Sequence, residues 1–181
     1  MKSLVELNKI DGGIISEKGT LHGYLPLYDK LFYPYRLKEI NFFEIGFWRG
    51  ASCKLMELYF PKAVIKYIDS DRSQSLNMQF TFTDPRVLFE YKDSRDLTRD
   101  YFNDFLPDIA IDDGSHYVAD QVHFIRTAYP VIRPGGLLIV EDIQNIDSSK
   151  IEFDRIGIPY ELIDFRPESG RWDDVLLIYR K

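Results

Sequence analysis

Two short apolar runs in this chain end in acidic residues, and the first is followed closely by a histidine. The acidic residues are Asp112 and Asp113 after the first run and Glu141 and Asp142 after the second, and the histidine is His116. An apolar run of this length is typical of a strand buried on both faces of a parallel sheet. Because the carboxyl ends of such strands face the ligand crevice, the five side chains are expected at one edge of the sheet. Clustered carboxylates without cysteine partners favour Mg²⁺, with Mn²⁺ or Ca²⁺ as alternatives, over zinc.

Each of these residues also has a simpler interpretation. Asp113 or Ser115 could be the N-cap of the helix that follows. Glu141 and Asp142 could be solvated residues at the end of a strand, and His116 could be a partly buried polar side chain with a backbone partner. Their joint placement on neighbouring strand ends favours the metal site over capping and solvation.

The elements that must position these residues alternate between strand and helix from residue 40 onward. Strands are predicted at 40–45, 63–69, 87–91, 108–112 and 135–142, helices at 51–60, 73–80, 96–105 and 118–129, and two last strands at 159–165 and 174–180. The spacing of the last two suits a hairpin. The alternation predicts an α/β fold with a mostly parallel, seven-stranded sheet, helices on both faces and a C-terminal antiparallel hairpin.

The residues before this alternation are expected to form a segment of their own. Residues 1–39 are interpreted as an N-terminal segment or lid packed on the main domain, residues 40–181, in a single-domain protein of ordinary size. The stretch 18–24 is polar and glycine-rich, so it could be a loop over a ligand or a solvated extension, and composition favours the extension. His22 and His123 are interpreted as structural or exposed, although His22 would reach a ligand if the loop closes as a lid.

The composition limits the class of protein. With 45% hydrophobic, 15% aromatic and 29% charged residues, the chain is expected to be globular. It has no apolar run of the roughly 18 residues that a membrane span needs and no secretory leader, so a cytoplasmic location is expected. A net charge of −6 argues against nucleic acid as a partner and favours a small-molecule substrate. The single cysteine, Cys53, can form neither an internal disulfide nor a thiolate zinc site.

The glycine turn after the first strand indicates which kind of nucleotide-like ligand could bind there. A dinucleotide site needs a glycine two residues after Gly46 so that pyrophosphate can approach the backbone, but that position is Trp48. Asp69 ends the second strand, where a carboxylate can accept from both ribose hydroxyls, and Asp93 follows the third, where it could accept from an adenine amino group. An adenosine pocket without a pyrophosphate subsite fits S-adenosylmethionine. The simpler interpretation is that the turn needs glycine regardless of ligand and that both aspartates are loop residues.

Motifs along nearly the whole chain carry a resemblance. They are Lys18-Gly19-Thr20 with His22 and Tyr24, Phe43-Glu44-Ile45-Gly46 with Gly50-Ala51-Ser52, Tyr67-Ile68-Asp69, Ile111-Asp112-Asp113-Gly114-Ser115-His116, Arg133-Pro134-Gly135-Gly136, Glu141-Asp142, and Asp173-Asp174-Val175-Leu176-Leu177-Ile178. In these motifs the sequence resembles the class I S-adenosylmethionine-dependent methyltransferases, whose fold is Rossmann-like. It is particularly similar to the small metal-dependent sugar O-methyltransferases of the macrolide-sugar (mycinamicin) and rhamnosyl type.

The resemblance implies an activity and a role for each site residue. The implied metal ligands are Asp113, Glu141 and Asp142, and the implied catalytic base is His116. The residues implied to bind the cofactor are Lys18, Thr20, Glu44, Gly46, Gly50, Ser52, Asp69, Asp93 and Asp112. The implied reaction moves a methyl group from S-adenosylmethionine to a hydroxyl of a sugar or glycosylated natural product, with a divalent cation that lowers the pKa of the hydroxyl.

Other functions are compatible with the same residues. One is a metal-independent methyltransferase whose carboxylates orient the substrate, and the acceptor could also be a catechol-like diol or a polyketide hydroxyl. Another is a non-catalytic scaffold that binds S-adenosylmethionine. The chain is short for the family, so acceptor recognition is expected from the N-terminal segment, from loops after the fourth and fifth strands, or from a partner subunit. Self-association as a homo-oligomer is expected, because a minimal domain rich in aromatics needs a neighbour to close its site.

Overall fold

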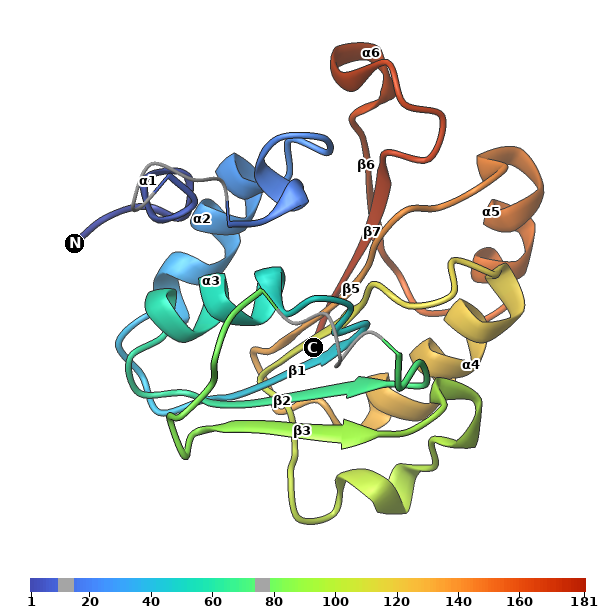
Figure 1. Ribbon diagram of the computed structural model, residues 1–181. Helices are drawn as coiled ribbons and strands as arrows, with labels where there is room; N and C mark the ends of the chain where they lie inside the picture. The colour runs from blue at the N-terminus through green and yellow to red at the C-terminus, as the bar shows by residue number, and fades with distance from the viewer. Residues whose placement is uncertain (10–14, 74–78) are drawn as a thin grey trace.

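The computed structural model describes residues 1–9, 15–73 and 79–181, whose strands form one mostly parallel sheet (Figure 1). The strand order is β3-β2-β1-β4-β5-β7-β6. The strands are β1 (Asn41–Ile45), β2 (Val64–Asp69), β3 (Val87–Tyr91), β4 (Ile109–Asp112), β5 (Leu137–Val140), β6 (Glu161–Asp164) and β7 (Val175–Arg180). Strands β1 to β5 pair in parallel, whereas β7 runs antiparallel to both β5 and β6. The predicted α/β fold with its C-terminal antiparallel hairpin is confirmed.

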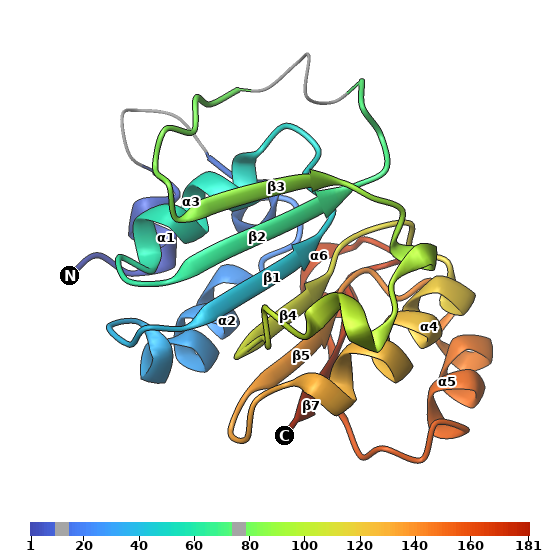
Figure 2. The same cartoon turned by 90° about the horizontal axis from the view of Figure 1, so that it is seen from below.

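Helices cover both faces of this sheet (Figure 2). The α-helices are α1 (Leu4–Leu7), α2 (Leu25–Phe32), α3 (Ala51–Tyr59), α4 (Val118–Ala128), α5 (Ile146–Asp154) and α6 (Arg166–Ser169). Helices α1, α2 and α3 pack on one face, and α4 and α5 on the other. None of the helices in the described ranges combines the length and apolarity that crossing a membrane requires.

Alternate residues of each central strand enter two different cores. On β1, Phe42 packs in the core under α2 and α3, with its ring centroid 5.7 Å from that of Phe60. The next residue, Phe43, faces α4, and its ring centroid lies 6.2 Å from that of Phe124. Full burial of one such side chain stabilises the fold by about 1.5–3 kcal/mol. The carboxyl ends of β1, β4 and β5 are therefore held rigidly from both faces.

The strand order reverses between β1 and β4, which places two loops side by side. Ile45 at the end of β1 is in register with Asp112 at the end of β4. The glycine turn that starts at Gly46 and the acidic loop that starts at Asp113 consequently leave the sheet next to each other. Open α/β sheets bind their ligands at such a reversal.

One predicted helix is wrong and another cannot be compared. Residues 96–105 were expected to be helical, but they contain only short 3-10 turns, η5 (Ser94–Asp96) and η6 (Arg99–Phe102). Between these turns Leu97 has an extended backbone and is 1% exposed, because its side chain enters the core beside α4. The helix predicted at 73–80 falls mainly on residues 74–78, which lie outside the described residues.

The N-terminal segment is part of the core on the α3 side of the sheet. It contains α1, the 3-10 turn η2 (Glu17–Gly19), α2 and the 3-10 turn η3 (Tyr33–Tyr35). Tyr24, Tyr28 and Phe32 are all 0% exposed. The solvated extension favoured by composition is thus wrong for this stretch, because Lys18, His22 and Tyr24 pair with carboxylates beyond the ends of the central strands.

The core beside α4 contains one hydroxyl whose removal is expected to stabilise the protein. Tyr179 on β7 is 0% exposed, and its hydroxyl has no hydrogen-bond partner within the described ranges. Because an unpaired buried polar group is unfavourable, Tyr179→Phe is expected to raise the free energy of unfolding by about 1 kcal/mol in urea titrations. Tyr129→Phe is the matched control, since that exposed hydroxyl already donates to the carbonyl of Arg180 at 2.9 Å. A less stable Tyr179 variant would mean that the hydroxyl has a partner in solution.

Candidate functional site

A cavity of about 550 Å³ opens at the carboxyl ends of the central strands. Its walls come from the loops after β1, β2, β3, β4 and β5 and from residues 16–22 of the N-terminal segment. Of the predicted site residues, those that line it are Lys18, Gly46, Ser52, Asp69, Asp93, Asp113, His116, Glu141 and Asp142. The structure therefore gathers residues from five loops and the N-terminal segment around one hollow.

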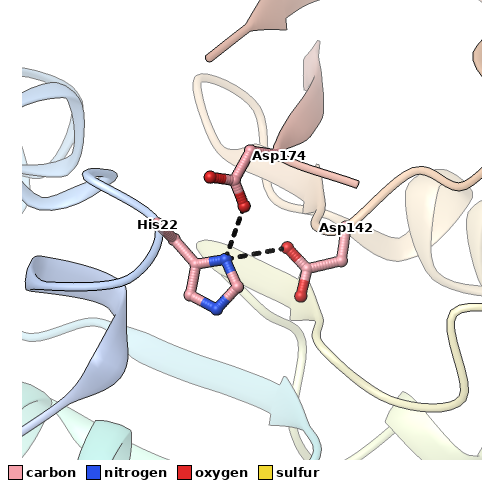
Figure 3. A group of neighbouring side chains, drawn as sticks. All are labelled: His22, Asp142 and Asp174. Atoms are coloured by element: carbon pink, nitrogen blue, oxygen red, sulfur yellow. Dashed lines mark hydrogen bonds and ion pairs between the residues drawn. The ribbon is translucent and has the colours of Figure 1, made fainter. Parts of the chain in front are cut away.

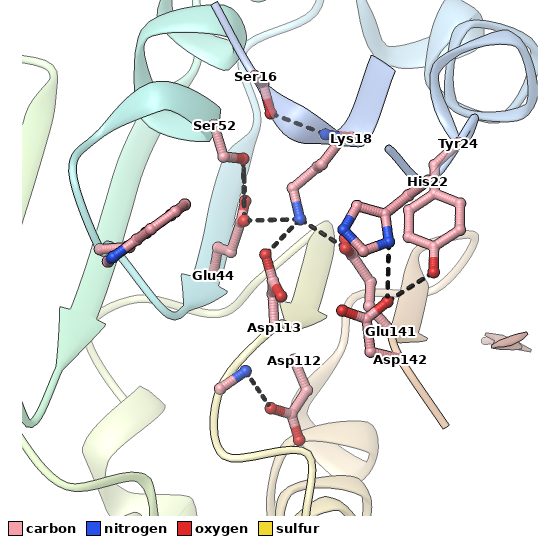
Figure 4. A network of polar contacts seen from close by, with 12 residues as sticks. Ser16, Lys18, His22, Tyr24, Glu44, Ser52, Asp112, Asp113, Glu141 and Asp142 are labelled. Carbon is pink, nitrogen blue, oxygen red and sulfur yellow. Dashed lines mark hydrogen bonds and ion pairs between the residues drawn. The ribbon is translucent and has the colours of Figure 1, made fainter. Parts of the chain in front are cut away.

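Lys18 lies in the middle of the acidic group (Figure 4). Its Nζ is 2.6 Å from Asp113 Oδ2, 2.5 Å from Glu141 Oε2 and 3.4 Å from Glu44 Oε1. Burial alone would lower the pKa of Lys18, but the three carboxylates outweigh it and hold that pKa well above its ordinary value. The side chain therefore stays charged and neutralises part of the acidic group.

Glu44 is fully buried and does not line the cavity. Its carboxylate accepts from Ser52 Oγ at 2.9 Å and from the Tyr67 hydroxyl at 2.6 Å. Burial raises the pKa of Glu44, while Lys18 and these donors act in the opposite direction. Glu44 and Ser52, both predicted to bind the cofactor, are thus hydrogen-bonded to each other. Ser52 lines the cavity, whereas Glu44 does not.

Two buried tyrosines fix the carboxylates after β5. Tyr28 donates to Glu141 Oε1 at 2.6 Å, and Tyr24 donates to Asp142 Oδ1 at 2.6 Å. Burial and the adjacent carboxylates raise the pKa of both tyrosines, so their hydroxyls stay protonated and donate. Burial also raises the pKa of Glu141, against the effect of Lys18.

The predicted metal ligands fall into two groups that share Asp113. In each group the ligand atoms lie within 4.8 Å of one another. One group contains Glu44, Asp113 and Glu141, and the other contains Asp113, His116 and Asp142. Oxygen-rich groups of this kind fit a hard divalent cation. His116 Nδ1 is 3.9 Å from Asp142 Oδ2, and it is buried without a hydrogen-bond partner in the part of the chain described.

His22 forms a third polar group at the rim of the same cavity (Figure 3). Its Nδ1 is 2.7 Å from Asp174 Oδ1 and 3.5 Å from Asp142 Oδ1. The pairing with buried Asp174 agrees with the structural interpretation of His22, and the ring also lines the cavity. Contact of His22 with a ligand stays a prediction. His123 is likewise structural as expected, since its Nε2 lies 3.0 Å from the carbonyl oxygen of Leu97.

The glycine turn is tied to the end of β2. Asp69 Oδ2 accepts from the backbone amides of Phe47 and Trp48, both at 2.9 Å. Asp93 also lines the cavity, but its carboxylate accepts from the backbone and side chain of Arg95. Those hydrogen bonds lower the pKa of Asp93 to about 2. Asp69 therefore orders the turn itself, whereas Asp93 is engaged by a neighbouring arginine.

Three non-glycine residues at the cavity have left-handed backbone angles. The φ angles are 43° at Trp48, 58° at His116 and 53° at Asp142. All three line the cavity. Such conformations are uncommon for side chains of this size, cost about 1–3 kcal/mol each, and cluster at functional sites.

Besides Glu44, three residues predicted to bind the cofactor do not line the cavity. Thr20 is exposed at the end of η2. Gly50 is needed for packing, because its φ is +82° and a Cβ there would lie 2.9 Å from the ring of Phe82. Asp112 is buried and accepts from the amide of Gly114 at 3.2 Å, and burial raises the pKa of Asp112 to about 7.

The capping alternative does not describe the acidic loop. The N-cap of α4 is Tyr117, and no side chain caps this helix. Asp113 instead pairs with Lys18, and Ser115 Oγ donates to Asp120 at 2.6 Å. The acidic loop is thus committed to polar contacts at the cavity.

Tyr24, Tyr28, Tyr67 and Asp174 are site residues that the sequence did not single out for a role. Tyr24 and Tyr28 are four residues apart at the start of α2, a spacing that puts both side chains on one helix face. This spacing of two tyrosines is the feature of the sequence that could have predicted their shared role. Tyr67 and Asp174 lie within motifs of the resemblance but carry no signal of their partners.

Comparison with known proteins gives relatives of one kind, although no family model matches the chain. It is 28% identical over 177 residues to demethylmacrocin O-methyltransferase of Streptomyces fradiae, covering 88% of this chain and 44% of that protein. It is 33% identical over 140 residues to 8-demethyl-8-alpha-L-rhamnosyl tetracenomycin-C 2'-O-methyltransferase of Streptomyces olivaceus, covering 71% of this chain and 35% of that protein.

A solved structure shows the same likeness. The MycE methyltransferase of the mycinamycin biosynthetic pathway, in complex with Mg, SAH and mycinamycin VI, matches with a TM-score of 0.63 and 28% identity, over 78% of this chain and 37% of that chain. The resemblance found in the sequence is thereby confirmed. The chain spans less than half the length of the curated relatives it matches.

Proposed function

We propose that this chain, which has the class I methyltransferase fold and is homologous to O-methyltransferases of glycosylated natural products, transfers a methyl group from S-adenosylmethionine to a sugar hydroxyl of a small molecule. One observation carries the proposal. The glycine turn after β1 and the group Asp113, His116, Glu141 and Asp142 share one cavity at the reversal of strand order. Donor and acceptor sites are therefore adjacent.

The cofactor half of the proposal rests on Gly46 and Asp69. The turn at Gly46 gives the chain a left-handed bend, with φ +94°, at the mouth of the cavity. Asp69 Oδ1 accepts only a loop amide, that of Asp71 at 2.8 Å, among the hydrogen bonds of the described residues, so a second lone pair is available for a ribose hydroxyl. Ser52 at the start of α3 would contact the same ligand.

The acceptor half rests on the carboxylates and on His116. Asp113, Glu141 and Asp142 would hold Mg²⁺, with Mn²⁺ or Ca²⁺ as substitutes, and the cation supplies the acidity that a sugar hydroxyl lacks at neutral pH. His116 would take the hydroxyl proton, and its Nδ1 lies 3.9 Å from Asp142 Oδ2. Tyr24 and Tyr28 keep the carboxylates in position.

The remaining parts of the proposal concern partners and location. A sugar acceptor is favoured over a catechol-like diol or a polyketide hydroxyl because the relatives' names specify sugar-bearing substrates. The net charge of −6 favours a small molecule over nucleic acid. A cytoplasmic location, self-association and the role of residues 1–39 as a lid complete the proposal.

The test is isothermal titration of S-adenosylmethionine into the wild-type protein with and without Mg²⁺. Binding is expected in the micromolar range, and Asp69→Asn is expected to weaken it by about tenfold through loss of a charged hydrogen bond. Asp104→Asn is the control, since Asp104 is exposed and lies outside the cavity. A protein that does not bind the cofactor contradicts the proposal.

Turnover then separates the alternatives. Transfer of labelled methyl to rhamnosyl or other sugar diols, lost on chelation of metal, is the expected result. Transfer that persists in a chelator favours the metal-independent enzyme. Cofactor binding without transfer to any sugar, catechol or polyketide acceptor favours the scaffold.

A further inference from the structure

Lys18 occupies the position in the acidic group that a cation would take. Its Nζ lies 2.5–2.6 Å from one oxygen each of Asp113 and Glu141. The side chain is 5% exposed and enters from η2, on the opposite side of the cavity from β4 and β5. Figure 4 shows the ammonium pointing into the space between Glu44, Asp113 and Glu141.

Five of the six carboxylate oxygens of this group accept hydrogen bonds from described residues. Glu141 accepts from Tyr28 with Oε1 and from Lys18 with Oε2. Asp113 Oδ2 accepts from Lys18. The Glu44 carboxylate accepts from the hydroxyls of Ser52 and Tyr67, and its Oε1 also lies 3.4 Å from Lys18 Nζ. A Mg²⁺ ion binds oxygen at about 2.0–2.1 Å. It therefore cannot lie between these carboxylates while the Lys18 ammonium is there.

The second group at the site does not include this lysine. The ligand atoms of Asp113, His116 and Asp142 lie within 4.8 Å of one another, and this group contains neither Glu44 nor Glu141. A divalent cation held there alone would leave Lys18 in place. The two groups therefore make opposite predictions for what Lys18 does when metal binds.

We propose that the ammonium of Lys18 and the divalent cation compete for the oxygens of Asp113 and Glu141, two of the three residues proposed above to hold the metal, so that metal binding drives Lys18 and the turn η2 out of the site. This inference rests on the metal-assisted function proposed above. Glu141 is the reason to expect this competition, because as a metal ligand it must release the lysine that now holds its Oε2. Lys18 thus sets the metal affinity and couples it to the position of the N-terminal segment.

The first test is titration of Mg²⁺ into Lys18→Met, which keeps the apolar stem and removes the charge. Because no ammonium has to be displaced, Mg²⁺ affinity is expected to rise about tenfold or more over the wild type. Lys92→Met is the control, since Lys92 lines the same cavity without a salt bridge to these carboxylates among the described residues. Its Mg²⁺ affinity is expected to stay within about twofold. Unchanged or weaker binding in Lys18→Met overturns the inference.

The second test uses the wild-type protein, in case the methionine variant does not fold. Lysines are labelled with an amine-reactive reagent with and without Mg²⁺, and the labelled sites are read by mass spectrometry. Labelling of Lys18 is expected to increase several-fold with Mg²⁺, whereas labelling of Lys92 stays constant. If Lys18 stays protected, the metal and the lysine coexist and the inference is wrong.

These results are separable from a failure of the proposed function. Failure of that function appears as absence of S-adenosylmethionine binding, which neither experiment measures. The inference is wrong if Mg²⁺ binds while Lys18 stays protected from labelling, or if Lys18→Met and the wild type bind Mg²⁺ equally well. A protein that binds no Mg²⁺ as wild type and as Lys18→Met contradicts both the metal site and the inference, even if the cofactor binds.

Discussion

Replacing Asp113 by asparagine is expected to weaken Mg²⁺ binding by more than about 100-fold, because altering a mere partner of a metal ligand already costs 10–100-fold. Asp113 belongs to both ligand groups, so neither group keeps its charge or its full set of oxygens in the variant. Metal-dependent methyl transfer should fall with the affinity. Binding of S-adenosylhomocysteine should change little, since Asp69 and the glycine turn are untouched. Titration calorimetry with each ligand measures both effects.

Asp120→Asn is the matched control for this variant. Asp120 also lines the cavity, but its carboxylate accepts from Ser115 and belongs to neither metal group. Its Mg²⁺ affinity is expected to stay within about threefold of the wild type, as for other partly exposed charges. Equal Mg²⁺ binding by Asp113→Asn and the wild type would show that the cation is held elsewhere.

Gly46→Ala is expected to lower the free energy of unfolding by about 4 kcal/mol, the sum of backbone strain and overpacking. The φ angle of Gly46 is +94°, and a Cβ there would lie 1.9 Å from the carbonyl oxygen of Asp113. The atom in the way is backbone, so it cannot rotate aside. The added methyl group must push the loop after β4 away from the turn after β1, and cofactor affinity should fall as well. Urea titration and titration calorimetry measure the two effects.

Gly135→Ala is the control that measures the cost of a left-handed backbone without a steric clash at Cβ. Gly135 has a similar φ of +80°, but a Cβ there would meet no atom within 4 Å. This variant is expected to lose only about 1–2 kcal/mol, the cost of left-handed backbone without a clash. Equal losses in the two variants would mean that the loops separate at little cost and are not held as tightly as the structure indicates.

The sheet could be predicted because its central strands are buried on both faces. All four residues of β4 and all four of β5 are buried, which gives continuous apolar runs in the sequence. Such runs end where the strand meets the cavity, so Asp113, Glu141 and Asp142 could be assigned to one edge. Helix α5 has no such signal: only Ser149 and Phe153 are buried among its nine residues, and its pattern is weakly amphipathic.

The contacts that complete the site could not be predicted, because they join residues far apart in the chain. Lys18 is separated from Asp113 by 95 positions and from Glu141 by 123. A lysine between a glutamate and a glycine in a polar stretch is typical of solvent exposure. Its burial depends on three carboxylates that the fold alone brings together. The same reason explains His22, whose partner Asp174 lies on the far side of the hairpin tip, 152 positions away.

Trp48, His116 and Asp142 have left-handed backbone angles. These site residues would therefore not keep their arrangement if their loops were transferred to another protein. In a short peptide or a grafted loop, each residue would relax to negative φ, which is the conformation that side chains of this size prefer. The surrounding strands supply the force that prevents this. Redesign of the acceptor range on this scaffold should therefore exchange exposed loop residues such as Tyr117 while retaining β1, β4 and β5 with the bends that follow them.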